Sequence, residues 1–268
     1  MRVTVRNAAA LLAACVLLAG CSDDGADETP DAAEDHGGRA AMSVAEHCAS
    51  VKRVDADATL TELEGDGITL TAADFASDAP SGTVLVLLHQ TGLLGLCGWG
   101  RFAPEAAAAG LPSVAVDLCG YGGSECDAGE ATPSEDQVAL AVAHARDALG
   151  AERVVLVGAS MGGSQTVIAV ARGAEVDGWA DLSGPDVWDG TTLADLAPDV
   201  QARGLPGLVA HAPDDNEQQY AAAQTLAEAT GATFLDGDSG HGWDLLTDNQ
   251  GTLRPDGRAL IDFALHGG

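Results

Sequence analysis

The chain has 268 residues, and its 41 acidic residues against 12 basic ones give it a formal charge of −29. So acidic a chain repels the phosphate backbones of DNA and RNA, and we therefore expect no nucleic-acid partner. We interpret the charge as a well-solvated surface. Aromatic residues make up only 4% of the chain, so a hydrophobic core must consist mainly of Val, Leu, Ile and Ala.

The first twenty residues have the form of a bacterial export signal. Arg2 and Arg6 form a basic start, and the apolar stretch 8–18 that follows is too short to span a bilayer. It ends in Leu18-Ala19-Gly20-Cys21, which resembles the lipobox of bacterial lipoproteins, whose cysteine becomes lipid-modified. We predict that residues 1–20 are a lipoprotein signal peptide and that Cys21 carries the lipid. The alternative is an ordinary signal peptide that happens to contain a cysteine.

Residues 21–42 are dominated by Asp, Glu, Ala and Gly and show no apolar periodicity, which indicates an acidic, flexible tether. Together with a lipid on Cys21, such a tether predicts a protein exported to the bacterial cell envelope and held on the outer face of the cytoplasmic membrane. Residues 43–268 are long enough for one folded domain with a sizeable core.

Four cysteines lie in this folded part, namely Cys48, Cys97, Cys119 and Cys126. In an exported protein they suggest two disulfides, for which three connectivities exist. We slightly favour Cys119–Cys126, which closes a small loop, together with Cys48–Cys97. The spacings match no metal-binding pattern, so we expect neither a metal site nor a cofactor.

Strands and helices alternate along the folded part. Residues 59–64 and 68–75 alternate apolar and polar side chains around a turn, which predicts an antiparallel hairpin at a sheet edge. Further strands are expected at 83–89, 113–117, 153–157, 176–182, 207–211 and 232–235. Helices are expected at 102–109, 134–149, 164–171, 218–229 and 254–265, and residues 185–204 form an excursion that we interpret as a small cap. This alternation predicts an α/β fold with a mainly parallel sheet of about eight strands and helices on both faces.

The first chemical signal follows the strand at 153–157. Gly158, Ser160 and Gly162 form a G-x-S-x-G pattern between a buried strand and a helix. Small residues allow the sharp bend that turns the serine oxygen outward, above the carboxyl ends of the strands. The bend also points the first free N–H groups of the helix, beginning with Met161, at the space beside that oxygen. The pattern indicates a nucleophile elbow; the alternative is a serine in an ordinary tight turn.

A serine nucleophile needs a base that is oriented by a carboxylate. Asp215 follows the strand at 207–211, and His241 follows the strand at 232–235 between two glycines. The order nucleophile, acid, histidine is that of the α/β-hydrolases. Asp215 has a structural alternative as a turn or helix-cap acid, and His241 as a surface histidine.

With these residues the chain resembles an α/β-hydrolase over its whole folded length. The resemblance rests on residues 88–90, 117 with 120–124, 158–163, 212–215 and 240–242. It implies the α/β-hydrolase fold and a catalytic triad of Ser160, Asp215 and His241. It also implies an oxyanion site made of backbone N–H groups.

The expected oxyanion donors are Met161 and either Gln90 or Thr91. The chain departs from the family's pattern at two points. Gln90 stands where the family often has glycine, so that a side chain borders the oxyanion site. The family's acid usually follows a glycine by three residues; here Ala212 stands at the glycine position, and counting three gives Asp215.

Two other acids stay open as alternatives, Asp214 next to Asp215 and Asp186 after the preceding strand. His89 and His211 end buried strands, and we interpret both as hydrogen-bonded groups of the core or pocket floor. The loop at 117–124 is interpreted as a structural turn that forms one rim of the cleft. Trp99 is expected to pack in the core, whereas Trp243 is equally compatible with packing and with lining the pocket.

The sequence thus predicts a lipid-anchored, extracytoplasmic serine hydrolase. The preferred activity is that of a carboxylesterase acting through an acyl-enzyme on a small or medium ester. A peptidase or other amide hydrolase of the same fold is the alternative within enzymes, and a catalytically silent binding lipoprotein is the alternative outside them. The expected partners are a small-molecule ester or acyl substrate and the membrane, and the oligomeric state stays open.

Overall fold

The structure is a computed structural model that describes residues 42–49, 58–126 and 134–267. All of these residues belong to one unit, Ala40–Gly268. The predicted signal peptide, the lipidation site at Cys21 and the tether up to residue 41 lie outside the described residues. Within the described ranges, no helix is both long and apolar enough to cross a bilayer.

One mixed sheet forms the centre of the fold. Along its main path it contains β1 (Ala58–Gly65), β2 (Ile68–Phe75), β3 (Thr83–Leu88), β4 (Ser113–Val116), β6 (Arg153–Ala159), β7 (Gly178–Leu182), β10 (Gly207–His211) and β11 (Thr233–Asp236). The order across the sheet is β1-β2-β4-β3-β6-β7-β10-β11, and the short β5 (Glu125–Cys126) adds to β2 as a ninth strand. From β4 to β11 all neighbours are parallel, whereas β1 and β2 are antiparallel at one edge. The predicted mainly parallel sheet and its edge hairpin are confirmed.

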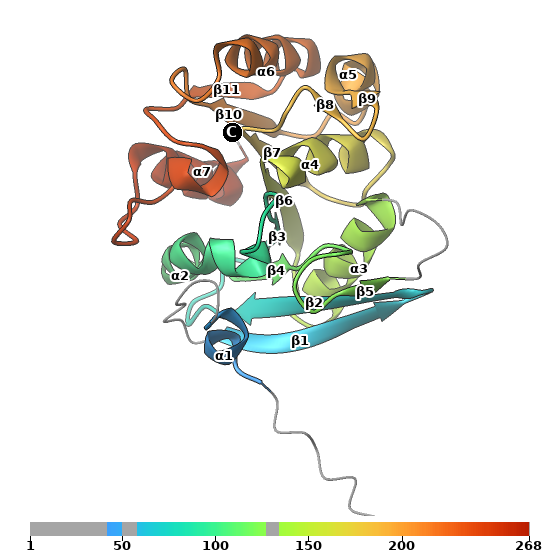
Figure 1. The fold of residues 1–268 in the computed structure, drawn as a ribbon, viewed down its shortest axis with the longest axis vertical. Coiled ribbons are helices and arrows are strands. Elements are labelled where there is room, and N and C mark those ends of the chain that lie inside the picture. Colours follow the sequence, from blue (N-terminus) through green and yellow to red (C-terminus); the bar gives the residue numbers. More distant parts are fainter. Residues whose placement is uncertain (1–41, 50–57, 127–133, 268) are drawn as a thin grey trace, which may run out of the picture. The chain divides into compact units, whose positions relative to one another are not determined.

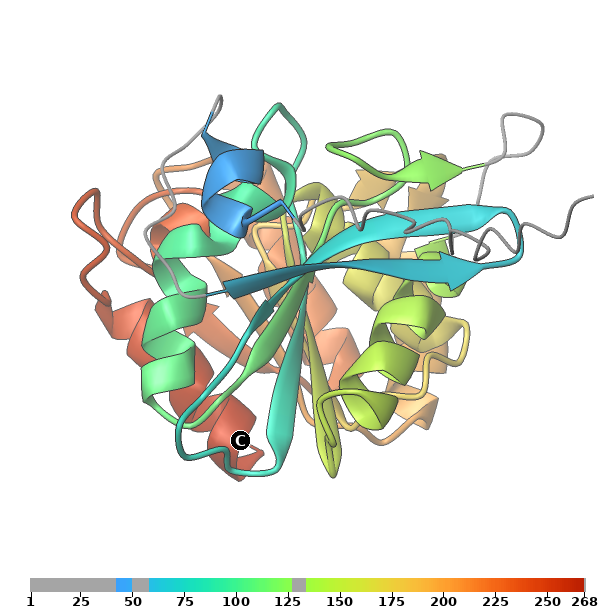
Figure 2. The same cartoon turned by 90° about the horizontal axis from the view of Figure 1, so that it is seen from below.

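Helices cover both faces of this sheet (Figures 1 and 2). One face carries α1 (Val44–Cys48), the 3₁₀ segment η1 (Gly95–Arg101), α2 (Phe102–Ala108) and α7 (Pro255–His266). The other face carries α3 (Ser134–Asp147), α4 (Met161–Ala171), α5 (Leu193–Ala202) and α6 (Glu217–Thr230). On β3, Leu85 and Leu87 face the first layer, and Val84 and Val86 face the second. This burial on both faces explains why the strand is apolar throughout.

The predicted helices are all present, with ends shifted by a few residues. The segment between β7 and β10 forms a hairpin of β8 (Val187–Trp188) and β9 (Thr191–Thr192), followed by α5. Helix α5 packs against α4 and α6 and so belongs to the layer on one face of the sheet. The sequence interpretation missed α1, η1, β5 and a second 3₁₀ segment, η2 (Gly242–Leu245), and it did not resolve β8, β9 and α5 within the excursion at 185–204.

Candidate active site

Ser160 lies between the end of β6 and the first residue of α4, on a strained backbone. Its φ of 51° and ψ of −115° are rare for a residue with a side chain. The bend is held from two sides, because Ser160 N donates to Leu182 O at 2.8 Å and Gly162 N donates to His89 O at 3.2 Å. A Cβ on Gly162 would lie 2.4 Å from Leu88 O, so only glycine fits there. The structure thus has the predicted sharp turn, with the serine side chain partly exposed.

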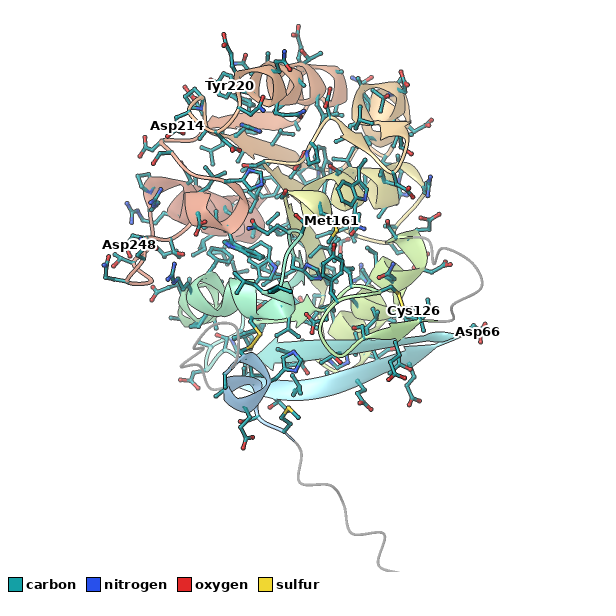
Figure 3. The ribbon with its side chains drawn as sticks, in the orientation of Figure 1. Asp66, Cys126, Met161, Asp214, Tyr220 and Asp248 are labelled. Carbon is teal, nitrogen blue, oxygen red and sulfur yellow. A yellow bond between two sulfur atoms is a disulfide. The ribbon has the colours of Figure 1, made fainter. Side chains whose placement is uncertain are left out.

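Free N–H groups lie at this turn and in the loop that follows β3. Within the described residues, no acceptor is present for the backbone N–H groups of Met161, Gln90 and Thr91. Met161 begins α4, where N–H groups have no partner inside the helix. Figure 3 labels Met161 near the middle of the molecule. The three predicted oxyanion donors are therefore available to an acceptor from outside the protein.

His89 joins this loop to the next strand end. Its Nδ1 lies 2.7 Å from Gln90 O, and its Nε2 accepts from Leu118 N at 3.0 Å. A histidine that donates through Nδ1 and accepts through Nε2 is neutral, and burial lowers the pKa of His89 accordingly. Its ring also packs edge-on against Tyr121, with 4.6 Å between centroids. The interpretation of His89 as a hydrogen-bonded core group is confirmed.

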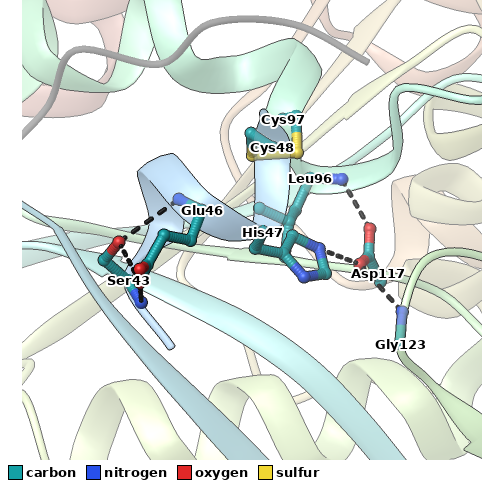
Figure 4. Close-up of a disulfide and its surroundings, with 8 residues drawn as sticks. All are labelled: Ser43, Glu46, His47, Cys48, Leu96, Cys97, Asp117 and Gly123. Atoms are coloured by element: carbon teal, nitrogen blue, oxygen red, sulfur yellow. Dashed lines mark hydrogen bonds and ion pairs between the residues drawn. A yellow bond between two sulfur atoms is a disulfide. The ribbon is translucent and has the colours of Figure 1, made fainter. Parts of the chain in front are cut away.

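Asp117 fixes the far end of the same loop. This fully buried carboxylate accepts from Leu96 N at 2.7 Å through Oδ1, and its Oδ2 lies 3.1 Å from His47 Nε2. Beside these contacts, the Cys48–Cys97 disulfide joins α1 to η1 (Figure 4). The second disulfide is Cys119–Cys126, so both favoured pairings are present. Asp117 and the first disulfide together hold the loop after β3, a role that the sequence interpretation of Asp117 as a turn residue missed.

His241 and Asp215 contact each other at the ends of β11 and β10. His241 Nδ1 lies 2.5 Å from Asp215 Oδ2, and the His241 side chain is 41% exposed. When Asp215 is ionised, Nδ1 must carry the proton, and Nε2 is left free as a base. The buried His211 also approaches Asp215 Oδ2, at 3.7 Å through Nε2. Burial lowers the pKa of His211, against the opposing effects of its hydrogen bond to Ala212 O and of the nearby Asp215.

The end of β7 connects the serine side of the site to the histidine side. Leu182 accepts from Ser160 N, and the next residue, Ser183, accepts from Gly242 N at 3.1 Å through its buried hydroxyl. A Cβ on Gly242 would lie 3.2 Å from Ala159 Cβ. The residue after His241 therefore lies close to the residue before Ser160. No hydrogen bond joins Ser160 Oγ to His241 in the part of the chain that the structure describes.

The two alternative acids lie elsewhere. Asp214 is exposed and has no described contact with His241. Asp186 is paired with Gln219, whose Nε2 donates to it at 2.8 Å. It lines a cavity of about 240 Å³ between α5 and α6, together with Gly184 and Leu193. Of the three candidate acids, the structure brings only Asp215 to His241.

The two tryptophans join the loops behind the site. Trp99 is fully buried, and Trp243 is 4% exposed. Their rings pack edge to face with 5.8 Å between centroids. Trp243 therefore packs η2, which follows His241, against η1, which follows the loop after β3. The possibility that Trp243 lines an open pocket is not supported by this burial.

Three side chains near the site were not singled out from the sequence as part of it. Ser183 has a positive φ of 58°. Asp181, two residues earlier on β7, is 1% exposed. Burial raises the pKa of Asp181 to about 7, against the effect of a hydrogen bond from Gly184 N. His47 lies on a short helix that the sequence did not predict. The only available signal was the position of residues 181–183 at a strand end on the same edge of the sheet as Ser160.

Comparison with known proteins agrees with this architecture. Residues 83–197 match the sequence model of the alpha/beta hydrolase fold, and no curated protein matches the chain. A solved structure described as a predicted CIB-like hydrolase from Thermoplasma acidophilum is 18% identical, with a TM-score of 0.59 over 78% of this chain and 98% of its own. A carboxylesterase from Bacillus subtilis is 17% identical, with a TM-score of 0.56 over 80% and 94%.

A proline iminopeptidase from Mycobacterium smegmatis is 14% identical, with a TM-score of 0.62 over 78% of this chain and 98% of its own. Identities this low establish a shared fold and leave the substrate open. The sheet order, the turn at Ser160 and the matching sequence model agree with one another, and the chain therefore has the fold of the α/β-hydrolase family.

Proposed function

We propose that the protein is a serine hydrolase that works through an acyl-enzyme, with carboxylic esters of small or medium size as its substrates. The observation that carries the proposal is the 2.5 Å contact between His241 Nδ1 and Asp215 Oδ2, at strand ends next to the turn that exposes Ser160. A nucleophile, a base and an orienting acid on one sheet edge are what acyl transfer requires.

In the first step, Ser160 Oγ bonds to the carbonyl carbon of the ester while its proton passes to His241 Nε2. The carbonyl π electrons move to the oxygen, and the free N–H groups of Met161, Gln90 and Thr91 are available to that oxyanion. Collapse of the tetrahedral intermediate breaks the bond to the leaving alkoxide, which takes the proton from His241. Water then repeats the sequence on the acyl-enzyme. Asp215 orients His241 and stabilises its charged form.

A fluorophosphonate probe tests the nucleophile. We expect the purified protein to be labelled at Ser160 and the Ser160→Ala variant to remain unlabelled. The contact between Ser160 and His241 is expected to tighten on substrate binding, as catalytic hydrogen bonds often do. Folded wild-type protein that resists labelling would contradict the proposal and favour a catalytically silent binding protein.

A second candidate, an amide hydrolase, is favoured by the likeness to a proline iminopeptidase. Nitrophenyl esters of increasing acyl length, assayed beside aminoacyl anilides, separate the two activities. Turnover of the short esters alone supports the carboxylesterase, and faster turnover of the anilides supports the amide hydrolase.

We also propose that the enzyme is exported and anchored through a lipid on Cys21. The support is the sequence of residues 1–42, namely a basic start, a short apolar stretch, a lipobox-like end and an acidic tether. Globomycin should block processing of the leader in cells. Unchanged processing together with a free Cys21 thiol would contradict the anchor but leave the proposed activity intact.

A further inference from the structure

Gln90 is one of the two positions at which the chain departs from the α/β-hydrolase sequence pattern, and its side-chain amide has no hydrogen-bond partner among the described residues. It is half-buried at the end of β3. Its Oε1 atom is fully buried and has no hydrogen-bond partner. An unpaired buried amide oxygen costs free energy, so a side chain kept in this position calls for a second reason.

The amide lies between the two halves of the catalytic machinery. A Cβ on Gly242 would lie only 2.4 Å from Gln90 Oε1 and 3.2 Å from Ala159 Cβ. Gly242 follows the proposed base and Ala159 precedes the proposed nucleophile. Gly242 also has a positive φ of 57°, so glycine serves there both for its backbone and for its lack of a side chain. Gln90 Oε1 therefore lies close to Gly242, beside the proposed base, and Gly242 in turn lies near the residue before the proposed nucleophile.

The other end of the amide is free. Gln90 Nε2 has no partner within the described ranges, and unlike Oε1 it is not fully buried. The N–H groups of Gln90, Thr91 and Met161 are unpaired in the same region. A side-chain N–H donor thus accompanies the backbone donors expected for an oxyanion.

The loop that carries this amide is fixed before any substrate binds. His89 Nδ1 contacts Gln90 O at 2.7 Å, and Gly162 N donates to His89 O at 3.2 Å. Asp117 holds the other end of the loop through Leu96 N. Donors stabilise a developing charge best when they need no rearrangement during the reaction.

We propose that Gln90 is a catalytic residue whose Nε2 donates a third hydrogen bond to the oxyanion of the tetrahedral intermediate. This rests on the acyl-transfer function proposed above. When the carbonyl π electrons move to oxygen, Nε2–H donates to that oxygen, while Met161 and Gln90 or Thr91 donate from the backbone. No proton is transferred from the amide, and the bond is released when the carbonyl re-forms.

The experiment compares two substitutions of similar size. Gln90→Met keeps the volume of the side chain, and Gln90→Glu keeps its shape, but both remove the N–H donor. We expect kcat for a nitrophenyl ester to fall about 100-fold in the Met variant, with KM unchanged, and to fall at least as far in the Glu variant, because its charge opposes the oxyanion. The inhibition constant of a trifluoromethyl ketone, which forms a tetrahedral adduct, should rise by a similar factor.

Gln165→Met is the matched control. Gln165 also has a buried Oε1 without a partner, but it lies within α4, five residues after Ser160, and not on the loop after β3. This variant should keep the wild-type kcat, and circular dichroism should show all three variants folded. If Gln90 only fills space, the neutral Met variant keeps wild-type turnover, and that result overturns the proposal.

The fluorophosphonate probe separates this failure from a failure of the proposed function. Complete labelling of Ser160 in the wild type and in Gln90→Met, together with slow ester turnover in the variant, supports both proposals. Complete labelling with unchanged turnover overturns the role of Gln90 alone. A wild-type protein that is not labelled overturns the acyl-enzyme and the role of Gln90 with it.

Discussion

On one side of the site, Ser160 and the loop after β3 are fixed by backbone hydrogen bonds, by the buried Asp117 and by a disulfide. On the other side, His241 and Asp215 stand on partly exposed loops and hold each other through one side-chain contact. The serine side is therefore part of the folded core, whereas the histidine side is attached to it. Loss of an anchoring contact such as that of Asp117 on the first side should damage stability and activity together, whereas loss of the Asp215 carboxylate on the second should damage activity alone.

Asp215→Asn removes the carboxylate that orients His241, and we expect it to have the largest effect on turnover of the variants discussed below. An amide at this position no longer favours the His241 tautomer with a free Nε2, so we expect kcat to fall about 10⁴-fold with KM little changed. Asp215 is 20% exposed, so the midpoint of urea unfolding should move little. The control is Asp214→Asn, which should keep full activity. The reverse pattern would assign the acid to Asp214.

The buried Asp181 lies on β7, two residues before Ser183, and should make the stability of the protein depend on pH. Burial raises its pKa to about 7, so between about pH 4 and pH 7 the folded protein keeps a proton that the unfolded chain releases. Its contribution to the free energy of unfolding is therefore largest below pH 4, decreases as the pH rises to 7 and stays low above. The decrease is at most about 4 kcal/mol.

The neutral variant Asp181→Asn should lose this dependence, because its oxygen still accepts from Gly184 N at every pH. Urea unfolding of both proteins at pH 5 and pH 8 measures the effect. We expect the variant to gain stability relative to the wild type on going to pH 8. Parallel pH profiles of the two proteins would show that Asp181 is ionised in the folded state.

Asp117→Ala removes the carboxylate that holds the loop after β3, and we expect the next largest effect on stability from it. The substitution leaves the buried Leu96 N without its acceptor and the half-buried His47 without its partner. We expect a loss of about 3 kcal/mol in the free energy of unfolding, measured with urea, and a lower kcat because the loop after β3 is no longer held. Asp117→Asn, which keeps an acceptor for Leu96 N, should lose less of both. Full stability with slow turnover in the Ala variant would contradict the coupling of the two properties on this side.

This contrast also explains what could be predicted from the sequence. The strands, the turn at Ser160 and the order of Ser160, Asp215 and His241 follow from local patterns, since apolar runs and glycine spacing act over a few residues. The fold class and most element positions were therefore correct. Even the pairing of Cys119 with Cys126 has a local basis in its short loop.

The contacts that were missed join residues far apart in the chain. His47 meets Asp117 across 70 positions and Gly242 meets Ser183 across 59. No periodicity records such pairs. Helix α1 was missed because five residues carry too little pattern to predict a helix. The buried Asp181 was missed because a strand with one acidic residue does not reveal which way that residue points.

Substitution of Ser183 has the smallest expected effect on stability and turnover. It tests how the hydrogen bond from Gly242 N to the Ser183 hydroxyl attaches the His241 loop to the end of β7. In Ser183→Ala, Gly242 N loses its buried acceptor, and we expect a loss of about 1 kcal/mol in stability. Turnover should fall about 10-fold with KM unchanged, because His241 is no longer held above Ser160. Ser183→Gly removes the same hydroxyl but suits the positive φ of 58° at this position. It should therefore be more stable than the Ala variant and equally slow.

Thr166→Ala, which removes a buried hydroxyl without a partner on α4, should keep full activity. A Gly variant that regains wild-type turnover would mean that the backbone of Ser183, and not its hydroxyl, positions His241.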